Sequence, residues 1–478
     1  MNKRAKKTKV IATLGPASST KEIMLELVKA GADVFRINFS HADYELVKRN
    51  VDIIREINQE YGYNISILGD LQGPKLRVGV VKEGSFLNPG DVLTFTNEPC
   101  EGDSTKVFMT YEKFPQDVKV GERILIDDGK LVFEVIETNQ KDTVKAKTIQ
   151  GGPLSSKKGV NFPNTNVSLP ALTEKDIEDA KFMIENEFDW IALSFVRHAQ
   201  DIIDLKKLIE AHSDFKIPII AKIEKPEGVK NIDEILLECD GLMVARGDLG
   251  VEVPMEEVPV IQKKLVDKAR YYSKPVIIAT QMMETMISSL TPTRAEVNDV
   301  ANNVLDGADA VMLSGETSVG KYPVDVVKNI TKIIKNIEST NLYEKKNDII
   351  EKITCVDDRF VTDMVCLNAV KIAETTGAAA IITLTHSGYT AFQISAHRPT
   401  SRIIVYSSNR RVLTILNLLW GVRAFYYDMN KSTDETVIQV NMLTHHYGYV
   451  EKGDFVVNLN AMPVYEGGKT NTLRLTNI

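Results

Sequence analysis

Short apolar runs alternate with amphipathic segments over most of the chain from Lys9 onward. Eight runs are almost continuous in Val, Ile, Leu and Ala, which is typical of parallel strands buried on both faces. Helical periodicity separates most of them, as at 173–187, where Thr173 offers an N-cap before an acidic first turn. Eight strand–helix units predict a closed TIM (β/α)8 barrel. The expected strands read KVIATLG, DVFRINFS, ISILGDLQG, DWIALSFV, IPIIAKIE, GLMVARGDL, PVIIATQ and AVMLSG.

The barrel pattern is interrupted once, between the third and fourth of these strands. Three stretches there, at 78–97, 121–137 and 142–152, read as strands broken by Gly, Pro, Asn and Asp turns. They predict a small antiparallel β domain, a β-barrel lid inserted into the larger barrel.

Three domains follow from this pattern. The catalytic barrel is expected over 1–73 and 168–341, which is close to the roughly 250 residues of a typical barrel of this kind. The inserted lid is expected over 74–167. Helix and strand patterns alternate again over 342–478, which predicts a separate C-terminal α/β domain.

Composition and charge exclude several classes of protein. The chain has 478 residues, 43% of them hydrophobic and 26% charged, with a net charge of −7, which gives nucleic acid no electrostatic footprint. No apolar run approaches the length of a membrane span, and Gly15 and Pro16 interrupt the only candidate signal-peptide core. The four cysteines lack CxxC spacing, so no zinc site or disulfide framework is indicated. We therefore expect a cytoplasmic protein without membrane or nucleic-acid partners.

Polar residues gather at the C-terminal ends of the expected strands. In a barrel of this type these ends face a common site. Any single Lys or Glu there is usually a solvated rim residue, but so many together indicate a functional site. They are Arg36, Asn38, Ser40, Asp70, Lys222, Glu224, Arg246, Gly247, Asp248, Thr280, Gln281, Ser314, Gly315 and Glu316.

Two carboxylates in this set suit a divalent cation. Glu224 and Asp248 end neighbouring strands and offer the hard oxygen ligands that Mg²⁺ prefers. Lys222 lies two residues before Glu224, so both side chains are expected on the same side of their strand, where an ammonium and a metal can stabilise a transferring phosphoryl group. Arg36 adds planar donors matched to phosphate oxygens.

Two further positions suit a substrate carboxylate and a nucleotide. Gly247 allows close approach to the backbone, and Thr280 offers a hydroxyl donor. Lys157 and Lys158, at the far edge of the insertion, read either as surface charge or, beside the hinge, as contacts for nucleotide phosphates.

Several strings resemble the pyruvate kinase family over essentially the whole chain and in family order. They are RINFSH, GDLQGPKLR, SKKGVNFP, IAKIEKPEGV, MVARGDLGVE, ATQMMETM, TRAEVNDVANNVLDGADAVMLSGET and GKTNTLRL. The resemblance implies a homotetrameric, cytosolic glycolytic enzyme that moves a phosphoryl group from phosphoenolpyruvate to ADP, giving pyruvate and ATP. It also implies a need for Mg²⁺ or Mn²⁺ and a lid that excludes water on closing.

The resemblance assigns a role to each matching position. Lys222 resembles the lysine that contacts the transferred phosphoryl group, Glu224 and Asp248 resemble the metal ligands, and Arg36 resembles the arginine that binds phosphoenolpyruvate. Gly247 and Thr280 match groups that bind the substrate carboxylate, and Thr280 and Ser314 match groups near the route of enolate protonation. The contacts to the ADP phosphates are matched by Arg77, Asn38 and Lys157 or Lys158.

One position changes the cofactors that the resemblance implies. Many family members bind K⁺ through the residues matching Asn38, Ser40, Asp70 and the backbone of Leu71, and carry Glu in a GPEIR loop. Here the loop reads GPKLR, with Lys75. An ammonium there can take the electrostatic role of the potassium ion, so activity without K⁺ is expected.

The segment THSGYT resembles the family loop that binds the phosphate of an allosteric effector. We expect Thr385, Ser387, Gly388 and Thr390 to form this pocket, although a bare Ser/Thr/Gly turn is more often structural. His386 and Tyr389 depart from the family pattern. The phosphorylated effector is therefore open between fructose bisphosphate, a monophosphate and a nucleotide.

Two other classes remain open from the residues alone. A barrel lyase such as an aldolase also uses Mg²⁺ and strand-end Glu, Asp and Arg side chains, but it has no use for ADP. A metabolite sensor that kept the fold would not need every catalytic position intact.

Overall fold

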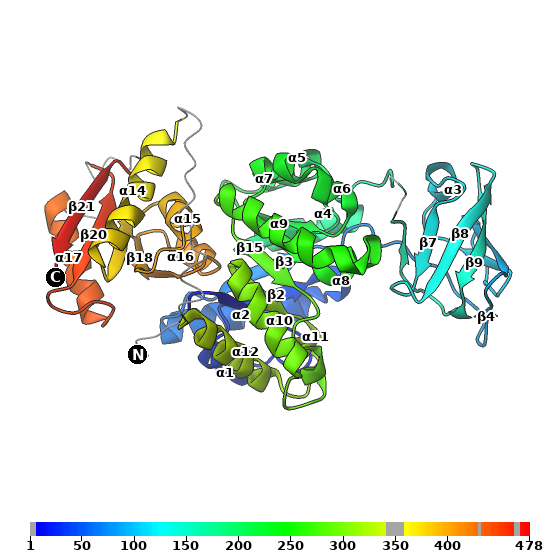
Figure 1. Cartoon of the computed structure of the whole chain (residues 1–478), viewed down its shortest axis with the longest axis horizontal. Helices are drawn as coiled ribbons and strands as arrows, with labels where there is room; N and C mark the ends of the chain where they lie inside the picture. The colour runs from blue at the N-terminus through cyan, green and yellow to red at the C-terminus, as the bar shows by residue number, and fades with distance from the viewer. Residues whose placement is uncertain (1–5, 164, 166, 341–357, 429–431, 463–468) are drawn as a thin grey trace.

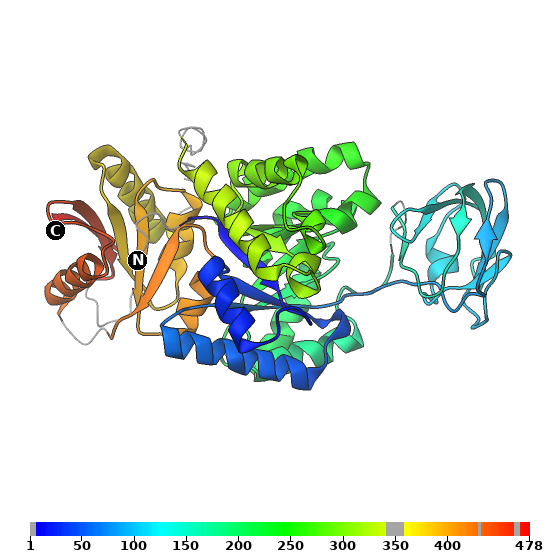
Figure 2. The same cartoon turned by 90° about the horizontal axis from the view of Figure 1, so that it is seen from below.

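The computed structural model arranges the chain as three bodies in a row: a C-terminal α/β domain, a central barrel and an inserted β domain (Figures 1 and 2). The chain leaves the central body, forms the inserted domain at one end of the molecule, and returns. The structure describes residues 6–163, 165, 167–340, 358–428, 432–462 and 469–478.

Eight parallel strands close the central barrel, which confirms the predicted fold and all eight predicted strands. Every strand residue except Asn38 is buried, as expected for strands covered by helices outside and by side chains within. In barrel order the strands are β1 (Lys9–Thr13), β16 (Ala310–Leu313), β15 (Val276–Ala279), β14 (Gly241–Ala245), β13 (Ile219–Ile223), β12 (Trp190–Leu193), β3 (Ser66–Asp70) and β2 (Val34–Asn38).

Helices cover the outside of the barrel, and their ends carry the expected signals. Thr173 caps α4 in a capping box with Asp176, as its sequence predicts. Among the described residues, no helix is both long enough and apolar enough to cross a membrane. The helices are α1 (Lys21–Ala30), α2 (Tyr44–Tyr61), α4 (Glu174–Glu185), α5 (Ala199–His212), α6 (Pro226–Lys230), α7 (Ile232–Glu238), α8 (Arg246–Glu252), α9 (Val258–Tyr271), α10 (Arg294–Asp306), α11 (Gly315–Ser318) and α12 (Pro323–Glu338).

The inserted domain is built on a six-stranded sheet in the order β11-β7-β8-β9-β5-β6. Its pairs are antiparallel except β5 with β6, which run parallel, so the expectation of a wholly antiparallel domain is wrong for this pair. The bridges Arg77 to Gly159 and Val78 to Met109 connect the two edges of the sheet and curl it toward a barrel. The elements are β4 (Phe86–Leu87), β5 (Val92–Thr96), β6 (Lys106–Phe108), α3 (Phe114–Asp117), β7 (Arg123–Ile126), β8 (Leu131–Thr138), β9 (Thr143–Gln150), β10 (Gly152–Pro153) and β11 (Val160–Asn161).

Both crossings between the barrel and the inserted domain are tied to the barrel. On the way out, the Gly73 amide donates to Asp176 Oδ1 at 3.0 Å. On the way back, the Arg197 guanidinium donates to the carbonyls of Val167 and Leu169. The two segments are therefore held on the rim, which suits a hinge.

The C-terminal domain is a five-stranded sheet in the order β19-β18-β17-β20-β21, with β21 antiparallel at one edge. It docks on the N-terminal end of the barrel, where Arg398 forms a buried ion pair with Asp309 at 2.7 Å and Trp190 Nε1 donates to the Ile415 carbonyl at 3.1 Å. The elements are α14 (Phe360–Thr376), β17 (Ala380–Leu384), α15 (Tyr389–Ala396), β18 (Arg402–Ser407), α16 (Arg410–Leu416), β19 (Val422–Tyr426), α17 (Thr433–His446), β20 (Phe455–Asn460) and β21 (Thr472–Asn477).

The predicted limits of the three domains stay predictions. The limit between 341 and 342 lies outside the described residues.

Candidate functional site

The Lys222 ammonium is the centre of a buried cluster at the C-terminal ends of four barrel strands. It lies 3.0 Å from Asp70 Oδ1 and 3.0 Å from Glu224 Oε1, and it donates to Ser194 Oγ at 2.6 Å. The contact with Glu224 confirms that the two side chains face the same way. Arg36 Nε joins from the next strand and donates to Asp70 Oδ2 at 2.7 Å. Two cations and two carboxylates thus meet where these four strands end.

Burial and pairing set the charge states of this cluster. Burial alone lowers the pKa of Lys222, but the Asp70 and Glu224 carboxylates more than offset it and hold that pKa above its ordinary value. Burial likewise raises the pKa of Asp70, while Lys222 and Arg36 outweigh it and keep the pKa of this carboxyl below its ordinary value. The pairing therefore favours the charged form of both the Lys222 ammonium and the Asp70 carboxylate.

Glu224 and Asp248 fit the metal ligands predicted from the sequence. Glu224 is 1% exposed, and the Phe195 amide donates to its Oε2 at 2.7 Å. Burial raises the pKa of Glu224, and the nearby Asp248 carboxylate raises it further against the lowering effect of Lys222. The two carboxylates repel each other where their strands end, and a divalent cation bound between them would relieve this repulsion.

No group of three or more His, Cys, Asp or Glu side chains able to hold a metal occurs within the described part of the chain. Mg²⁺ typically binds through one or two carboxylates and completes its coordination with water and substrate phosphate. The Glu224 and Asp248 pair suits this mode better than an all-protein metal cage.

Gly247 and Thr280, predicted to bind a carboxylate, are in direct contact. Thr280 Oγ1 accepts from the Gly247 amide at 2.8 Å and donates to the Ala279 carbonyl at 2.6 Å. Thr280 has φ of 68°, an outlier for a β-branched residue. Arg246 Nη2 holds this turn by donating to the Thr280 carbonyl at 2.8 Å and to the Gln281 carbonyl at 3.1 Å. A strained, braced backbone of this kind is typical of a functional site.

Ser314 lies at the end of β16, beside the Thr280 turn. Glu316 joins the two loops, because its Oε2 accepts from the Ser314 amide at 2.7 Å and its Oε1 accepts from the Met283 amide at 3.2 Å. Burial raises the pKa of Glu316. The side chain of Glu316 therefore fixes the spacing between the loops that carry Thr280 and Ser314.

The residues predicted to contact a nucleotide lie on two different bodies. Asn38 caps the 3₁₀ turn after β2, with its Oδ1 accepting from the Ser40 amide at 3.1 Å. Arg77, Lys157 and Lys158 belong to the inserted domain, which projects away from the barrel in Figure 1. Lys158 pairs with Asp127 at 3.0 Å. Within the described residues, no hydrogen bond or ion pair joins these three cations to the Lys222 cluster.

The residues of the predicted monovalent-cation site are partly engaged by protein groups. The Asp70 carboxylate contacts Lys222 and Arg36, and the Leu71 carbonyl accepts from Ser194 Oγ at 2.7 Å. Lys75 is exposed, and the structure gives its ammonium no ion pair among the described residues. Its predicted role in place of K⁺ therefore rests on residue type alone.

The predicted effector loop connects β17 to α15. The Gly388 amide donates to Thr385 Oγ1 at 3.0 Å, and Gly388 has φ of 86°, which favours glycine. Thr390 Oγ1 is 2.9 Å from Thr470 Oγ1, and Ser387 is exposed. These hydroxyls lie at the start of α15. The hydrogen bond from the Gly388 amide to Thr385 Oγ1 lies within the loop, as it would in a purely structural turn.

Sequence reasoning missed two residues that position the cluster. Ser194 is 1% exposed and lies between Lys222 and the Leu71 carbonyl. Thr13, at the end of β1, accepts from Arg36 Nη1 at 3.1 Å. Both follow the rule that polar strand-end residues face the site, and a search of every strand end for hydroxyls would have found them.

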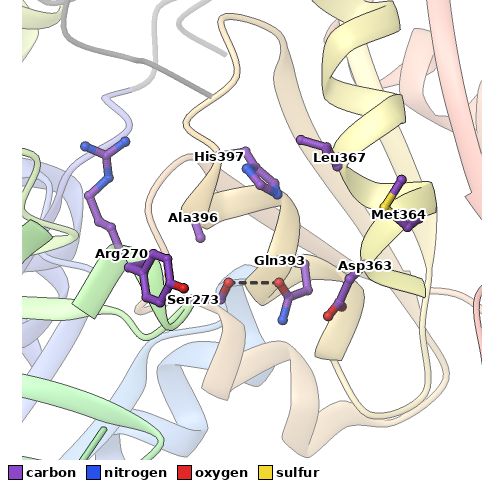
Figure 3. A pocket seen from close by; sticks show the side chains of 9 residues that line it. Arg270, Ser273, Asp363, Met364, Leu367, Gln393, Ala396 and His397 are labelled. Atoms are coloured by element: carbon purple, nitrogen blue, oxygen red, sulfur yellow. Dashed lines mark hydrogen bonds between the residues drawn. The ribbon is translucent and has the colours of Figure 1, made fainter. Parts of the chain in front are cut away.

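Figure 3 shows a hollow lined by residues of the barrel and of the C-terminal domain. Ser273 precedes β15 and so lies at the opposite end of that strand from Thr280, and its hydroxyl donates to Gln393 Oε1 at 2.8 Å. The hollow belongs to the contact between the two domains. Its lining residues are Arg270, Tyr271, Ser273, Asp363, Met364, Leu367, Gln393, Ala396 and His397.

Comparison with known families matches both halves of the chain. Residues 5–327 match the family described as pyruvate kinase, barrel domain, and residues 363–476 match the one described as pyruvate kinase, alpha/beta domain.

Individual relatives span nearly the whole chain. A pyruvate kinase 2 of Synechocystis sp. is 43% identical over 95% of this chain and 76% of its own length. The pyruvate kinases of Geobacillus stearothermophilus and Mycobacterium intracellulare are 42% and 40% identical, covering 98% and 99% of this chain and 80% and 99% of their own lengths. The crystal structure of a pyruvate kinase from Cryptosporidium parvum superposes with a TM-score of 0.92 at 32% identity, covering 99% of this chain and 97% of that chain.

Proposed function

The chain belongs to the pyruvate kinase family, and we propose that its barrel strand ends transfer the phosphoryl group of phosphoenolpyruvate to ADP, giving pyruvate and ATP in the last step of glycolysis. The bond between phosphorus and the C2 oxygen of phosphoenolpyruvate breaks, and a new bond forms to the terminal phosphate of ADP. The remaining enolate takes a proton at C3.

Lys222 and Arg36 stabilise the transferring group. Catalysis of phosphoryl transfer is mostly positioning and electrostatic stabilisation. In the structure the Asp70 carboxylate contacts both cations, which supports their joint action on one phosphoryl group. A bound substrate adds its phosphoryl oxygens to charges that are already in place.

Glu224 and Asp248 would hold Mg²⁺ or Mn²⁺, which when bound neutralises charge on the phosphoryl oxygens. The Gly247 amide and the Thr280 hydroxyl, which donate to protein oxygens in the structure, would turn to the substrate carboxylate when it binds. Thr280 and Ser314 lie near the route by which we expect the enolate carbon to receive its proton.

The inserted domain supplies the nucleotide contacts and closes the site. Arg77 and Lys157 or Lys158 would reach the ADP phosphates after the domain swings over the barrel to meet Asn38. Closure of this kind excludes water from the reacting phosphoryl group.

Cofactor, regulation and assembly complete the proposal. We infer activity without K⁺ from Lys75, and an effector phosphate at Thr385, Ser387, Gly388 and Thr390. We also propose a homotetramer and a cytoplasmic location, which the same family membership supports. A shift of the phosphoenolpyruvate saturation curve by fructose bisphosphate, a sugar monophosphate or AMP would identify the effector, and sedimentation would measure the assembly.

The observation that carries the activity is the contact of one ammonium, Lys222, with both Asp70 and a metal-ligand candidate, Glu224. A coupled assay tests it: pyruvate should appear from phosphoenolpyruvate only when ADP is present, with one ATP per pyruvate. Pyruvate formed without ADP would contradict a phosphotransferase and would favour the barrel lyase.

A further inference from the structure

A buried ion pair, Lys225 with Glu252, lies next to the two proposed metal ligands. Lys225 Nζ is 2.5 Å from Glu252 Oε1, and the two side chains are 12% and 0% exposed. Lys225 directly follows Glu224, and Glu252 ends α8 four residues after Asp248. The pair therefore connects the two segments that carry the ligands.

The barrel ladder does not connect these segments. The register between β13 and β14 ends at the pair Ile223 and Val244. Glu224 and Asp248 both lie beyond that point, so no strand hydrogen bond fixes their separation. The contact between Lys225 and Glu252 connects the two segments beyond the C-terminal ends of both strands.

The ligand segments need such a link, because their carboxylates repel each other. Asp248 acts on Glu224 as a like charge. Glu252 adds a third carboxylate nearby, and its Oε2 is buried without a hydrogen-bond partner among the described residues. The Lys225 ammonium thus neutralises a buried anion and ties the segments together in one contact.

A neutral hydrogen-bond donor from the inserted domain also contacts Glu252 Oε1, the oxygen that pairs with Lys225. Asn161, in β11, donates from Nδ2 to Glu252 Oε1 at 2.8 Å. This contact joins the inserted domain to α8 but does not connect the two ligand segments. It therefore offers an internal comparison for the ion pair.

We propose that Lys225 is a positioning residue for the divalent cation, which acts by holding the Glu224 and Asp248 segments at the separation that the cation requires. The inference rests on the proposed function only in taking Glu224 and Asp248 as metal ligands. It deepens that function by naming what sets the geometry of the ligands.

The sign of one substitution separates positioning from simple electrostatics. Replacing a lysine near a cation site by a neutral residue removes repulsion, so Coulomb's law alone predicts tighter binding of Mn²⁺ in Lys225→Met. Loss of positioning predicts weaker binding, by roughly tenfold, since residues that orient metal ligands typically contribute 10- to 100-fold.

The measurement uses the full-length protein and Mn²⁺ alone, with free Mn²⁺ followed by electron paramagnetic resonance. We expect the dissociation constant to rise about tenfold in Lys225→Met and to recover in Lys225→Arg, which restores the charge and the reach. If Lys225→Met does not fold because Glu252 is left buried and unpaired, the double variant Lys225→Met/Glu252→Gln removes both charges together. Coulomb's law then predicts little change in Mn²⁺ affinity, whereas loss of positioning still predicts weaker binding.

Two controls isolate the role of the pair. Asn161→Ala removes the other donor to Glu252, and Lys206→Met breaks the 2.7 Å pair with Glu238 that joins α5 to α7. Both should leave Mn²⁺ affinity unchanged, whatever they do to the melting temperature. Affinity in Lys225→Met equal to or tighter than in the unaltered chain would overturn the inference.

The fate of the proposed function can be read separately. If Glu224→Gln binds Mn²⁺ as well as the unaltered chain does, the ligands are wrong and the inference falls with them. If Lys225→Met binds Mn²⁺ weakly while the unaltered chain forms no pyruvate, the inference stands and the proposed reaction fails.

Discussion

Lys222 Nζ lies 3.0 Å from Glu224 Oε1, so the ammonium that we assign to the phosphoryl group touches a carboxylate that we assign to the metal. With a cation held by Glu224, this contact would bring the two sources of positive charge to one reacting group.

Lys222→Met should lower kcat by roughly 10²- to 10³-fold, because removing one preformed electrostatic contact to a transition state typically costs this much. The variant should still fold, and circular dichroism would test this. The matched control is Lys216→Met, whose partner Asp240 lies 3.0 Å away at the other end of the barrel, with the lysine largely exposed. A Lys222→Met enzyme with nearly normal kcat would contradict the assignment.

Ser194→Ala should lower kcat about tenfold, because hydrogen bonds to charged groups contribute roughly 1.5 to 3 kcal/mol and the Ser194 hydroxyl is the neutral partner of Lys222. Steady-state kinetics at saturating metal would measure it. Ser401→Ala removes a similarly buried hydroxyl, bonded to the Ala378 carbonyl at 2.6 Å in the C-terminal domain, and should leave kcat unchanged. Equal effects of both variants would argue against a positioning role.

Activity should persist in buffers free of K⁺ and Na⁺ if, as we propose, the Lys75 ammonium takes the place of the monovalent cation. Lys75→Glu should create a K⁺ requirement, with activity restored by added KCl but not by tetramethylammonium chloride. A loss of several orders of magnitude in the unaltered enzyme on omitting K⁺ would refute the substitution.

Stability should fall at mildly acidic pH because of His397. Burial, followed by the charges of Arg270 and Lys371, lowers the pKa of His397 to about 4. Between about pH 6.5 and pH 4 the unfolded chain binds a proton at this position that the folded chain does not, so the free energy of unfolding decreases as the pH falls. The loss from this one group is about 2 kcal/mol at pH 5.

Urea unfolding at pH 7 and pH 5 would measure this effect. His397→Gln should show a smaller decrease between the two pH values than the unaltered chain, because the amide does not titrate. Identical decreases would show that other groups account for the acid sensitivity.

The barrel could be predicted from the sequence because the signal is local. Continuous apolar runs mark strands buried on both faces, and Thr173 marks a helix start within one turn. The side on which Lys222 and Glu224 lie also follows from strand periodicity alone. These features need no knowledge of distant contacts.

What the sequence could not show depends on contacts between distant segments. The sequence around Ser194 does not indicate that its hydroxyl contacts the Lys222 ammonium, 28 residues later in the chain. The left-handed backbone of Thr280 is held by Arg246, from the preceding strand end. The parallel pairing of β5 with β6 likewise depends on the path that the chain takes through residues 97–105 between the two strands.

The inserted domain leaves the barrel between β3 and β12, yet these strands pair directly, with Trp190 opposite Leu68 and Ala192 opposite Asp70. Helix α4 lies after the insertion and before β12, so the strand, crossover helix and strand form a complete right-handed unit without it. The insertion thus occupies a single loop of the barrel, between β3 and α4. Its length and sequence can diverge during evolution while the packing of the host barrel stays the same.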